Sequence, residues 1–395
     1  MFLRHRNLAI YLVIAVVASL FLWPRAPKWP SVHNRVDLEI LNVTLGFQHI
    51  FVINLSTRTE RRDAMTLSAA LSELKITWVD GVAGKDVPDN ALPGDPTTRQ
   101  GAFGLGNKGS WRAHMNVLQR IVRENVTSAL ILEDDADWDV RLKLQMQAFA
   151  QAAMVFTQPS NKHTLAEKYR DKPHPEFLVT QLPLMTRARD TPYGDGWDVL
   201  WLGHCGTEFP ATTEPYKPSP LRVIIPNDMT VPSPSHLRAH PFALQDNLAQ
   251  EYPPYTRVVH ASSGTTCTQA YAVSQRGARK LLWRFGLQTL TTGWDLMLRD
   301  WCDGLYTRPM DPSTNEDTWG SGRIKTPVCV TVQPPLFSHH YGKGAASDIM
   351  APGGGFVNKE TEMTPYVRIS VRLNMERLIS GEEAVEQWAE DTEHV

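Results

Sequence analysis

Residues Ala129–Asp139 read ALILEDDADWD, so four apolar residues run directly into five acids within seven positions. The apolar half is typical of a strand that is buried on both faces of a sheet. The acids follow at the end of this strand, where they would repel one another without a positive partner. Open α/β sheets bind their ligands at this end of the strands. The stretch therefore predicts a buried sheet and, at its edge, a site that attracts cations.

Strands and helices alternate on both sides of this stretch. A second apolar run, His49–Leu55, predicts another buried strand, and Ser56 and Thr57 are cap candidates for a helix over 58–74. The other expected strands are 76–79, 198–202, 268–274 and 327–332, and the other expected helices begin at Ser110, after Ser274 and at Gly293. This order predicts an α/β fold with a mostly parallel sheet flanked by helices.

The composition fits a globular protein with a sizeable core. The chain has 395 residues, of which 42% are hydrophobic and 21% are charged. Its formal net charge is −2, from 40 basic and 42 acidic residues. Because there is no basic excess, we do not expect nucleic acid as a partner.

The N-terminus predicts a membrane anchor. The segment Asn7–Pro24 carries no charge, and at about 1.5 Å per residue it just spans a bilayer core of about 30 Å. A signal peptide has a similar apolar core, but no small-residue cleavage pattern is evident here. We expect a cytosolic tail over 1–6, an uncleaved signal-anchor over 7–24 and a lumenal body. This topology predicts a single-pass type II protein of the ER or Golgi membrane.

Cysteines and glycosylation acceptor patterns also fit a lumenal body. The acceptor patterns begin at Asn42, Asn54 and Asn125, and the cysteines are Cys205, Cys267, Cys302 and Cys329. Three pairings of these cysteines are possible. We favour Cys205–Cys267 with Cys302–Cys329, because each bond then closes one loop region. The alternative is four buried free thiols.

The body divides by composition. Residues 25–45 are expected to form a stem, 46–345 the main domain, and 346–395 a C-terminal extension with a charged helix near 368–390. Ten of the 28 prolines lie between Cys205 and Val258. We therefore expect a long Pro-rich surface insertion over 205–256.

The acids after Leu132 have two interpretations. Glu133, Asp135 and Asp137 alternate, and such carboxylates bind Mg²⁺ or Mn²⁺ together with a diphosphate. A calcium loop of the EF-hand kind is excluded, because Val140 and Met146 stand where Gly and Glu are needed. The second interpretation is a solvated loop whose acids favour the N-terminus of the next helix.

Several segments, taken in order, resemble glycosyltransferase family 25. They are HIFVINLSTRTERRDAM from His49, GSWRAHMNVLQRIVRENVTSALILEDDADW from Gly109, and TQAYAVSQRGARKLL from Thr268, followed by GWDLML from Gly293. The family includes bacterial lipopolysaccharide galactosyltransferases and animal procollagen galactosyltransferases. The anchor suggests a eukaryotic, fungal-type member of the secretory pathway.

This resemblance implies a GT-A-like fold with a nucleotide-binding sheet. It also implies transfer of a hexose, usually galactose, from a UDP-sugar, with inversion and with Mn²⁺ (or Mg²⁺) as cofactor. The acceptor would be a glycan or glycoprotein. The family's Asp-x-Asp site for metal and diphosphate matches Glu133, Asp134 and Asp135, so these acids are expected to hold the donor.

Further residues are candidates by chemistry. Asn54, Arg58 and Arg61 follow the first strand, where an arginine would bind phosphate or stack on uracil. The alternative is a solvated helix face on which Glu60 and Asp63 pair with their neighbours.

Asp295, flanked by Trp294 and Leu296, is our first choice for the base that deprotonates the acceptor; the alternative is a helix N-cap. His339 is a candidate third metal ligand with His340 beside it. His114 and His204 are weaker candidates for the functional site.

Two other function classes stay open. One is a non-catalytic lumenal glycan-binding protein that retains the fold, and the other is a metal-dependent nucleotide-sugar hydrolase. Free sugar or phosphate, instead of a glycoside, would identify the hydrolase.

Overall fold

The computed structural model describes residues 39–95, 104–211, 217–237, 247–307, 326–343, 349 and 361–388. Residues Glu39–Val395 form one compact unit. The expected tail (1–6), signal-anchor (7–24) and the stem as far as residue 38 lie outside the described residues. Within the described ranges, no helix is long and apolar enough to cross a membrane.

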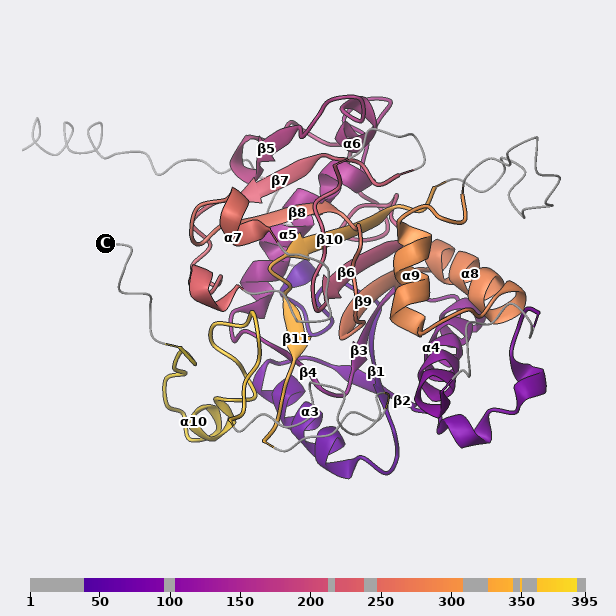
Figure 1. Cartoon of the computed structure of the whole chain (residues 1–395). Helices are drawn as coiled ribbons and strands as arrows, with labels where there is room; N and C mark the ends of the chain where they lie inside the picture. The colour runs from indigo at the N-terminus through magenta and orange to yellow at the C-terminus, as the bar shows by residue number, and fades with distance from the viewer. Residues whose placement is uncertain are drawn as a thin grey trace, which may run out of the picture. The chain divides into compact units, whose positions relative to one another are not determined.

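Eleven strands and eight α-helices carry the described fold (Figure 1). The strands are β1 (His49–Asn54), β2 (Ile76–Asp80), β3 (Ser128–Glu133), β4 (Ala136–Trp138), β5 (Glu176–Leu178), β6 (Val199–Gly203), β7 (Arg222–Ile225), β8 (Arg257–Ala261), β9 (Ala270–Ser274), β10 (Cys329–Gln333) and β11 (Phe337–His339). The helices are α3 (Thr59–Leu71), α4 (Leu105–Arg123), α5 (Leu142–Thr157), α6 (Leu165–Lys168), α7 (Leu248–Glu251), α8 (Gln275–Trp283), α9 (Trp294–Cys302) and α10 (Met375–Ile379).

The strands form one mixed sheet in the order β2-β1-β3-β9-β6-β10-β8-β7-β5, with β11 and β4 beside this path. Strand β1 is parallel to both β2 and β3, whereas β9 is antiparallel to β3 and β6. Of the pairings between described strands, five are parallel and five antiparallel. The prediction of a mostly parallel sheet is therefore wrong, because an apolar run reports burial and not strand direction.

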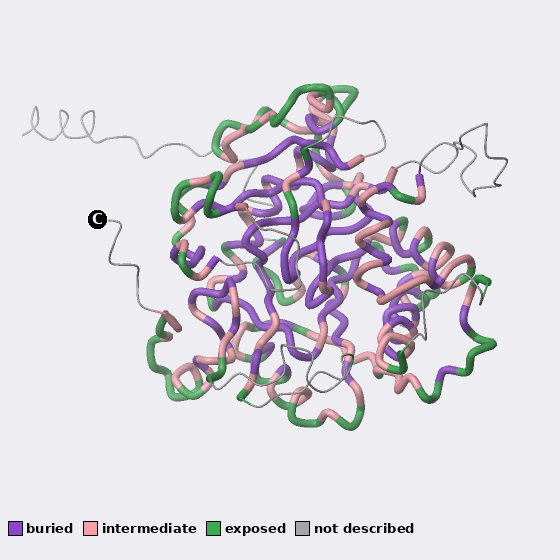
Figure 2. Tube along the Cα trace, viewed as in Figure 1, coloured by how far each residue is buried: buried purple, intermediate pink, exposed green. Residues whose placement is uncertain are grey.

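Helices α4, α8 and α9 pack on one face of the central strands. Trp111, Trp294 and Phe285 meet Ile131 of β3 and Trp201 of β6 in one buried cluster. The central strands are almost wholly buried, as Figure 2 shows in purple. The predicted buried strands 49–55 and 129–132 are confirmed within one or two residues.

Three local predictions have different outcomes. The Ser274 hydroxyl accepts a hydrogen bond from the Gly277 N–H at 3.1 Å, so the predicted cap of α8 is confirmed. Caps by Ser56 and Thr57 are wrong, since α3 begins after Arg58 without a side-chain cap. The C-terminal charged helix is also wrong in extent: within 368–388 only Met375–Ile379 is helical, and the rest forms turns, bends and irregular segments.

The Pro-rich region is not a surface insertion throughout. Its segment Arg222–Ile225 forms β7, which pairs with β5 and β8 and extends the sheet. Prolines lie on both sides of β7, and because proline is typical of loops and strand edges, this short strand is difficult to predict from the sequence. The preferred disulfide pairing, Cys205–Cys267 and Cys302–Cys329, is confirmed.

Asp198 joins three elements at the start of β6. Its side chain is fully buried, and it accepts hydrogen bonds from Lys280 Nζ at 2.8 Å, Arg276 Nε at 2.9 Å and the Val328 N–H at 3.0 Å. Lys280 and Arg276 lie on α8, and Val328 leads into β10. One carboxylate thus holds α8 and β10 against β6.

We predict that Asp198→Asn lowers the free energy of unfolding by about 2–4 kcal/mol, because it leaves two cations beside a neutral amide. Urea unfolding of the purified protein measures this. Asp63→Asn, at an exposed position of α3, is the control and should change the value by less than about 0.5 kcal/mol. A similar small effect at Asp198 would contradict the structural role.

Candidate functional site

The candidate site lies where β1 and β3 end side by side. These strands are parallel, and Ile53 is in register with Glu133. Asn54 and Asp134 therefore follow at neighbouring positions, and Asn54 Nδ2 donates to Asp134 Oδ2 at 2.8 Å. The same amide donates to the Arg58 carbonyl at 3.1 Å, which fixes the start of α3. The register of two buried strands thus brings together Asn54 and Asp134, two residues that the sequence analysis names separately as candidates.

Arg61 supplies the positive partner that the acids require. It lies in the first turn of α3, and its Nη1 donates to Asp134 Oδ1 at 2.8 Å and to Asp135 Oδ2 at 2.6 Å. All three side chains are at least 86% buried, with exposed fractions of 14%, 10% and 12%. The protein itself therefore offsets part of the charge conflict seen in the sequence.

Asp135 is the most strongly ionised acid of the site. Burial alone would raise the pKa of Asp135, but attraction to His339, Arg61 and Arg372 outweighs it and lowers that pKa to about 2. Its Oδ1 atom is buried and has no hydrogen-bond partner among the described residues, and the same holds for the Oδ1 atom of Asn54. Two buried oxygens that lack donors suit a hard cation, which prefers oxygen ligands.

His339 approaches the same carboxylate. Its Nε2 lies 3.6 Å from Asp135 Oδ2, and its ring stacks on Tyr341 with centroids 4.2 Å apart. Burial lowers the pKa of His339, although Asp135 opposes this, so the neutral imidazole that a metal requires is favoured. His340 instead lies 3.1 Å from the Thr364 hydroxyl through Nδ1. Of the adjacent histidines, only His339 is directed toward Asp135.

A metal ion fits this site only together with a substrate. Within the described ranges, no group of three or more His, Cys, Asp or Glu is placed to hold a metal ion. Asp135 and His339 provide two candidate ligands, with unpartnered oxygens beside them. Mg²⁺ is commonly bound by one or two carboxylates and completed by phosphate oxygens and water. The residues present fit that pattern.

Asp137 does not join this cluster. Both of its carboxylate oxygens are occupied, by the Thr364 hydroxyl at 2.7 Å, the Trp138 N–H at 2.8 Å, the Arg372 N–H at 3.2 Å and the Ser370 hydroxyl. It lies in β4, a three-residue strand that pairs with β11. A three-residue strand has no recognisable sequence pattern, so alternation with Asp135 does not predict the direction of the Asp137 side chain.

Glu133 lies toward a second set of polar groups. It accepts from the Thr268 hydroxyl at 2.7 Å, and His114 Nε2 is 3.8 Å away. Burial and the charge of Asp135 raise the pKa of Glu133 to about 8. Glu133 is therefore a protonated acid near neutral pH in the metal-free protein, in contrast to Asp135 two residues later.

Asp295 lies beside this second set. Its Oδ2 accepts from the Cys267 N–H at 3.0 Å, and the next residue, Thr268, binds Glu133. The residues 267–268 therefore link the two acids. The N-cap alternative for Asp295 is wrong, because Gly293 occupies the N-cap of α9.

Other sequence candidates lie elsewhere. Arg58 Nε binds Glu60 at 2.5 Å at the start of α3, where the Glu60 side chain is 61% exposed and that of Arg58 is 20% exposed. Buried His114 contacts the Tyr271 hydroxyl at 2.8 Å and stacks on Trp294. His204 is a core residue whose Nε2 donates to the Val332 carbonyl at 2.8 Å.

Sequence reasoning missed Arg372. Its Nη2 donates to the Asp134 carbonyl at 2.7 Å, although it lies far along the chain. Its targets are main-chain carbonyls, and these leave no pattern of residue types that a sequence reader could detect.

A cavity of about 500 Å³ lies apart from these acids, at the β5–β7 edge of the sheet. Its buried Arg222 binds Glu251 at 2.5 Å and Tyr252 at 2.9 Å, so charges within the cavity already compensate one another. The acids of the candidate site lie at the ends of β1 and β3, toward the opposite side of the sheet.

Comparison with known proteins gives one family. Residues 47–196 match the profile of glycosyltransferase family 25, described as an LPS biosynthesis protein family. This region contains β1, α3, β3 and the acids after it.

Three relatives illustrate the match. A glycosyltransferase 25 family member of Anopheles gambiae is 36% identical over 112 residues, which cover 26% of this chain and 19% of that protein. Procollagen galactosyltransferase 1 of Danio rerio is 32% identical over 116 residues, covering 27% and 19%. A Bos taurus protein named "Probable inactive glycosyltransferase 25 family member 3" is 25% identical over 172 residues, covering 41% and 28%. The matched segments thus span less than a third of each relative.

The raised pKa of Glu133 predicts a pH-dependent stability difference. The folded protein holds this proton up to about pH 8, whereas the unfolded chain releases it near pH 4.5. The stabilising contribution is therefore complete below about pH 4.5 and is lost as the pH rises toward 8. Glu133→Gln keeps a neutral acceptor for Thr268 and removes this loss.

We compare the unfolding free energy of Glu133→Gln with that of the native protein in metal-free buffer. The difference should shift by about 2 kcal/mol in favour of Glu133→Gln as the pH rises from 5 to 8. This value is discounted because 23% of the Glu133 side chain is exposed. Urea unfolding at both pH values measures it, with Glu376→Gln at an exposed position as the control. Equal pH profiles for all three proteins would show that Glu133 is ionised in the folded state.

Proposed function

We propose, because residues 47–196 match the profile of glycosyltransferase family 25, that the protein transfers a hexose from a UDP-sugar to a glycan or glycoprotein acceptor. Galactose is the hexose we favour, with inversion at the anomeric carbon. The observation that carries the proposal is the Asp134–Asp135 pair, held by Arg61 at the ends of β1 and β3, with an unpartnered oxygen on Asp135. A GT-A-like arrangement places a nucleotide donor at this position of the sheet.

The donor side must stabilise a leaving diphosphate. Arg61 is already among the acids, and a guanidinium binds phosphate oxygens in a fork that lysine cannot form. Asn54 keeps the Asp134 carboxylate oriented through its amide. We propose that Asp135 and His339 hold Mn²⁺ or Mg²⁺, which acts as a Lewis acid on the diphosphate when bound.

The acceptor side must remove a proton from a hydroxyl group. Asp295 is the base we propose, because Cys267 engages only its Oδ2 atom and Oδ1 has no hydrogen bond among the described residues. Glu133 is less suited, since its raised pKa leaves it protonated near neutral pH. The two acids lie on either side of the 267–268 link, so they share one end of the sheet with the donor acids.

One observation favours a non-catalytic glycan-binding protein as the second candidate. The acids already have Arg61 and Arg372 as cationic partners, so the cluster is stable without a ligand. The name of one relative, "Probable inactive glycosyltransferase 25 family member 3", supports this second candidate. A nucleotide-sugar hydrolase is distinguished by its products.

We also propose the cellular location from the sequence. An uncharged apolar segment over 7–24 and two disulfides fit a type II membrane protein with a lumenal catalytic domain in the ER or Golgi.

The test is Mn²⁺-dependent release of UDP from a panel of UDP-sugars, with a mixture of acceptor glycans and glycoproteins. We expect one sugar to be transferred as a glycoside, and Asp135→Asn to slow the reaction by about 100-fold or more. Glu60→Gln, on the outer surface of α3, is the matched control and should retain activity.

Two results would contradict the proposal. Release of free sugar without a glycoside would identify a hydrolase. A native protein that binds acceptor glycans but releases UDP from no donor would favour the binding protein.

A further inference from the structure

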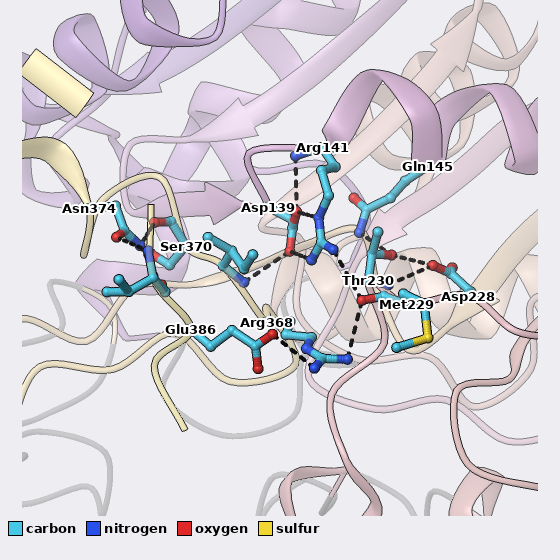
Figure 3. A network of polar contacts seen from close by, with 12 residues as sticks. Asp139, Arg141, Gln145, Asp228, Met229, Thr230, Arg368, Ser370, Asn374 and Glu386 are labelled. Carbon is cyan, nitrogen blue, oxygen red and sulfur yellow. Dashed lines mark hydrogen bonds and ion pairs between the residues drawn. The ribbon is translucent and has the colours of Figure 1, made fainter. Parts of the chain in front are cut away.

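A C-terminal segment lies against the loop that carries the donor acids. We call residues 363–374 the strap and residues 134–140 the acid loop. The Val140 N–H donates to the Ile369 carbonyl at 3.0 Å, and the Val371 N–H donates to the Trp138 carbonyl at 3.0 Å. The strap and the loop thus run side by side through main-chain hydrogen bonds. Figure 3 shows part of this contact, with Ser370 close to Asp139.

Side chains reinforce the contact from both partners. Asp139 accepts from the Ile369 N–H at 2.9 Å, and Asp137 accepts from the Thr364 hydroxyl at 2.7 Å. The strap in turn is braced from behind, since Asn374 binds the main chain of Val385 through both its oxygen and its nitrogen. The strap is therefore an ordered element that reaches the acid loop.

Arg372 is the strap residue that reaches furthest into the site. Its Nη2 donates to the Asp134 carbonyl at 2.7 Å, and its Nε donates to the Ala136 carbonyl at 3.2 Å. These two carbonyls stand on either side of Asp135. One planar guanidinium therefore fixes the main chain before and after the acid whose oxygen is unpartnered.

The charge of Arg372 matters as well as its hydrogen bonds. The carboxylates of Asp134 and Asp135 share Arg61, and Asp137 lies close behind them. Opposite charge within a few ångströms stabilises buried carboxylates, whereas an uncompensated buried charge is costly. A second cation beneath the loop keeps this group of acids together.

We propose that Arg372 is a positioning residue of the donor site, which fixes the acid loop so that Asp134 and Asp135 face the nucleoside diphosphate. This inference rests on the proposed function. It also makes the C-terminal segment part of the donor site, although sequence composition sets that segment apart as an extension. Arg372 acts through the loop and does not contact the reacting atoms.

Two matched variants separate this role from a general loss of strap structure. Asn374→Ala weakens the bracing of the strap but leaves Arg372 in place. Arg377→Gln removes one positive charge from α10, where Arg377 binds the Glu383 carbonyl, and serves as the charge control. Neither side chain has a hydrogen bond to the acid loop among the described residues.

The first measurement is hydrogen exchange of the metal-free protein, followed on peptides that cover the acid loop and His340. We expect Arg372→Gln to accelerate exchange of the Trp138 and His340 amides, whose acceptors are Asp137 and the Asp135 carbonyl. Arg377→Gln should not change it. Unchanged exchange in Arg372→Gln would overturn the proposal, whatever its activity.

The second measurement is calorimetric binding of UDP in the presence of Mn²⁺. We expect Arg372→Gln to weaken UDP by about tenfold or more, Arg372→Lys to weaken it less because the charge is kept, and Arg377→Gln to leave it unchanged. If Arg372→Gln does not fold, Arg372→Lys carries both measurements, with intermediate effects expected. Faster exchange in Arg372→Gln with unchanged UDP affinity would overturn the link to the donor site. An equal loss of UDP affinity in Asn374→Ala and Arg372→Gln would also overturn it.

Failure of the proposed function gives a different result. In that case the native protein binds no UDP, with or without Mn²⁺, and this alone overturns the donor role of the acids. The exchange measurement needs no ligand, so it still decides whether Arg372 positions the loop.

Discussion

The shared ion pair between Arg61 and the carboxylates of Asp134 and Asp135 is the interaction on which the candidate site depends. Two buried acids at the end of a strand are tolerated only with compensation, because removing an ion from water costs several kcal/mol. Arg61 provides it from α3 at 2.8 and 2.6 Å. The compensation is incomplete, since the buried Oδ1 atom of Asp135 has no hydrogen-bond partner in the part of the chain that the structure describes. Under the proposed function, a site of this kind is stable when empty and would bind a cation together with the donor diphosphate.

Segments far apart in the sequence meet to build this arrangement. The parallel pairing of β1 and β3 sets Asn54 beside Asp134, and β11 brings His339 to Asp135. The strap closes the loop from the C-terminal side. The buried centre of the sheet, visible in Figure 2, keeps these strand ends in register. The precision of the site thus comes from buried main-chain pairing, and the acids themselves contribute little to it.

The sequence predicted what local patterns encode. Continuous apolar runs located β1 and β3, and the position of Arg61 after a strand marked it as a candidate partner of an anion. Strand direction was not accessible, because β9 is as apolar as its neighbours and yet antiparallel to them. Local patterns do not show that Asp137 binds Thr364 and Ser370, since the short β4 depends on pairing with distant β11. Arg372 could not be predicted from the sequence because its side chain binds main-chain carbonyls, which every residue has.

A crystal structure with Mn²⁺ and UDP would test the central claim most directly, because manganese scatters anomalously and can be located without ambiguity. The account predicts a manganese signal at Asp135, with the diphosphate beside it and Arg61 turned at least partly from the carboxylates to the phosphate oxygens. It would be contradicted by crystals in which neither manganese nor UDP is ordered at the acid loop and Arg61 still bridges Asp134 and Asp135. The acids would then be a self-compensated structural cluster.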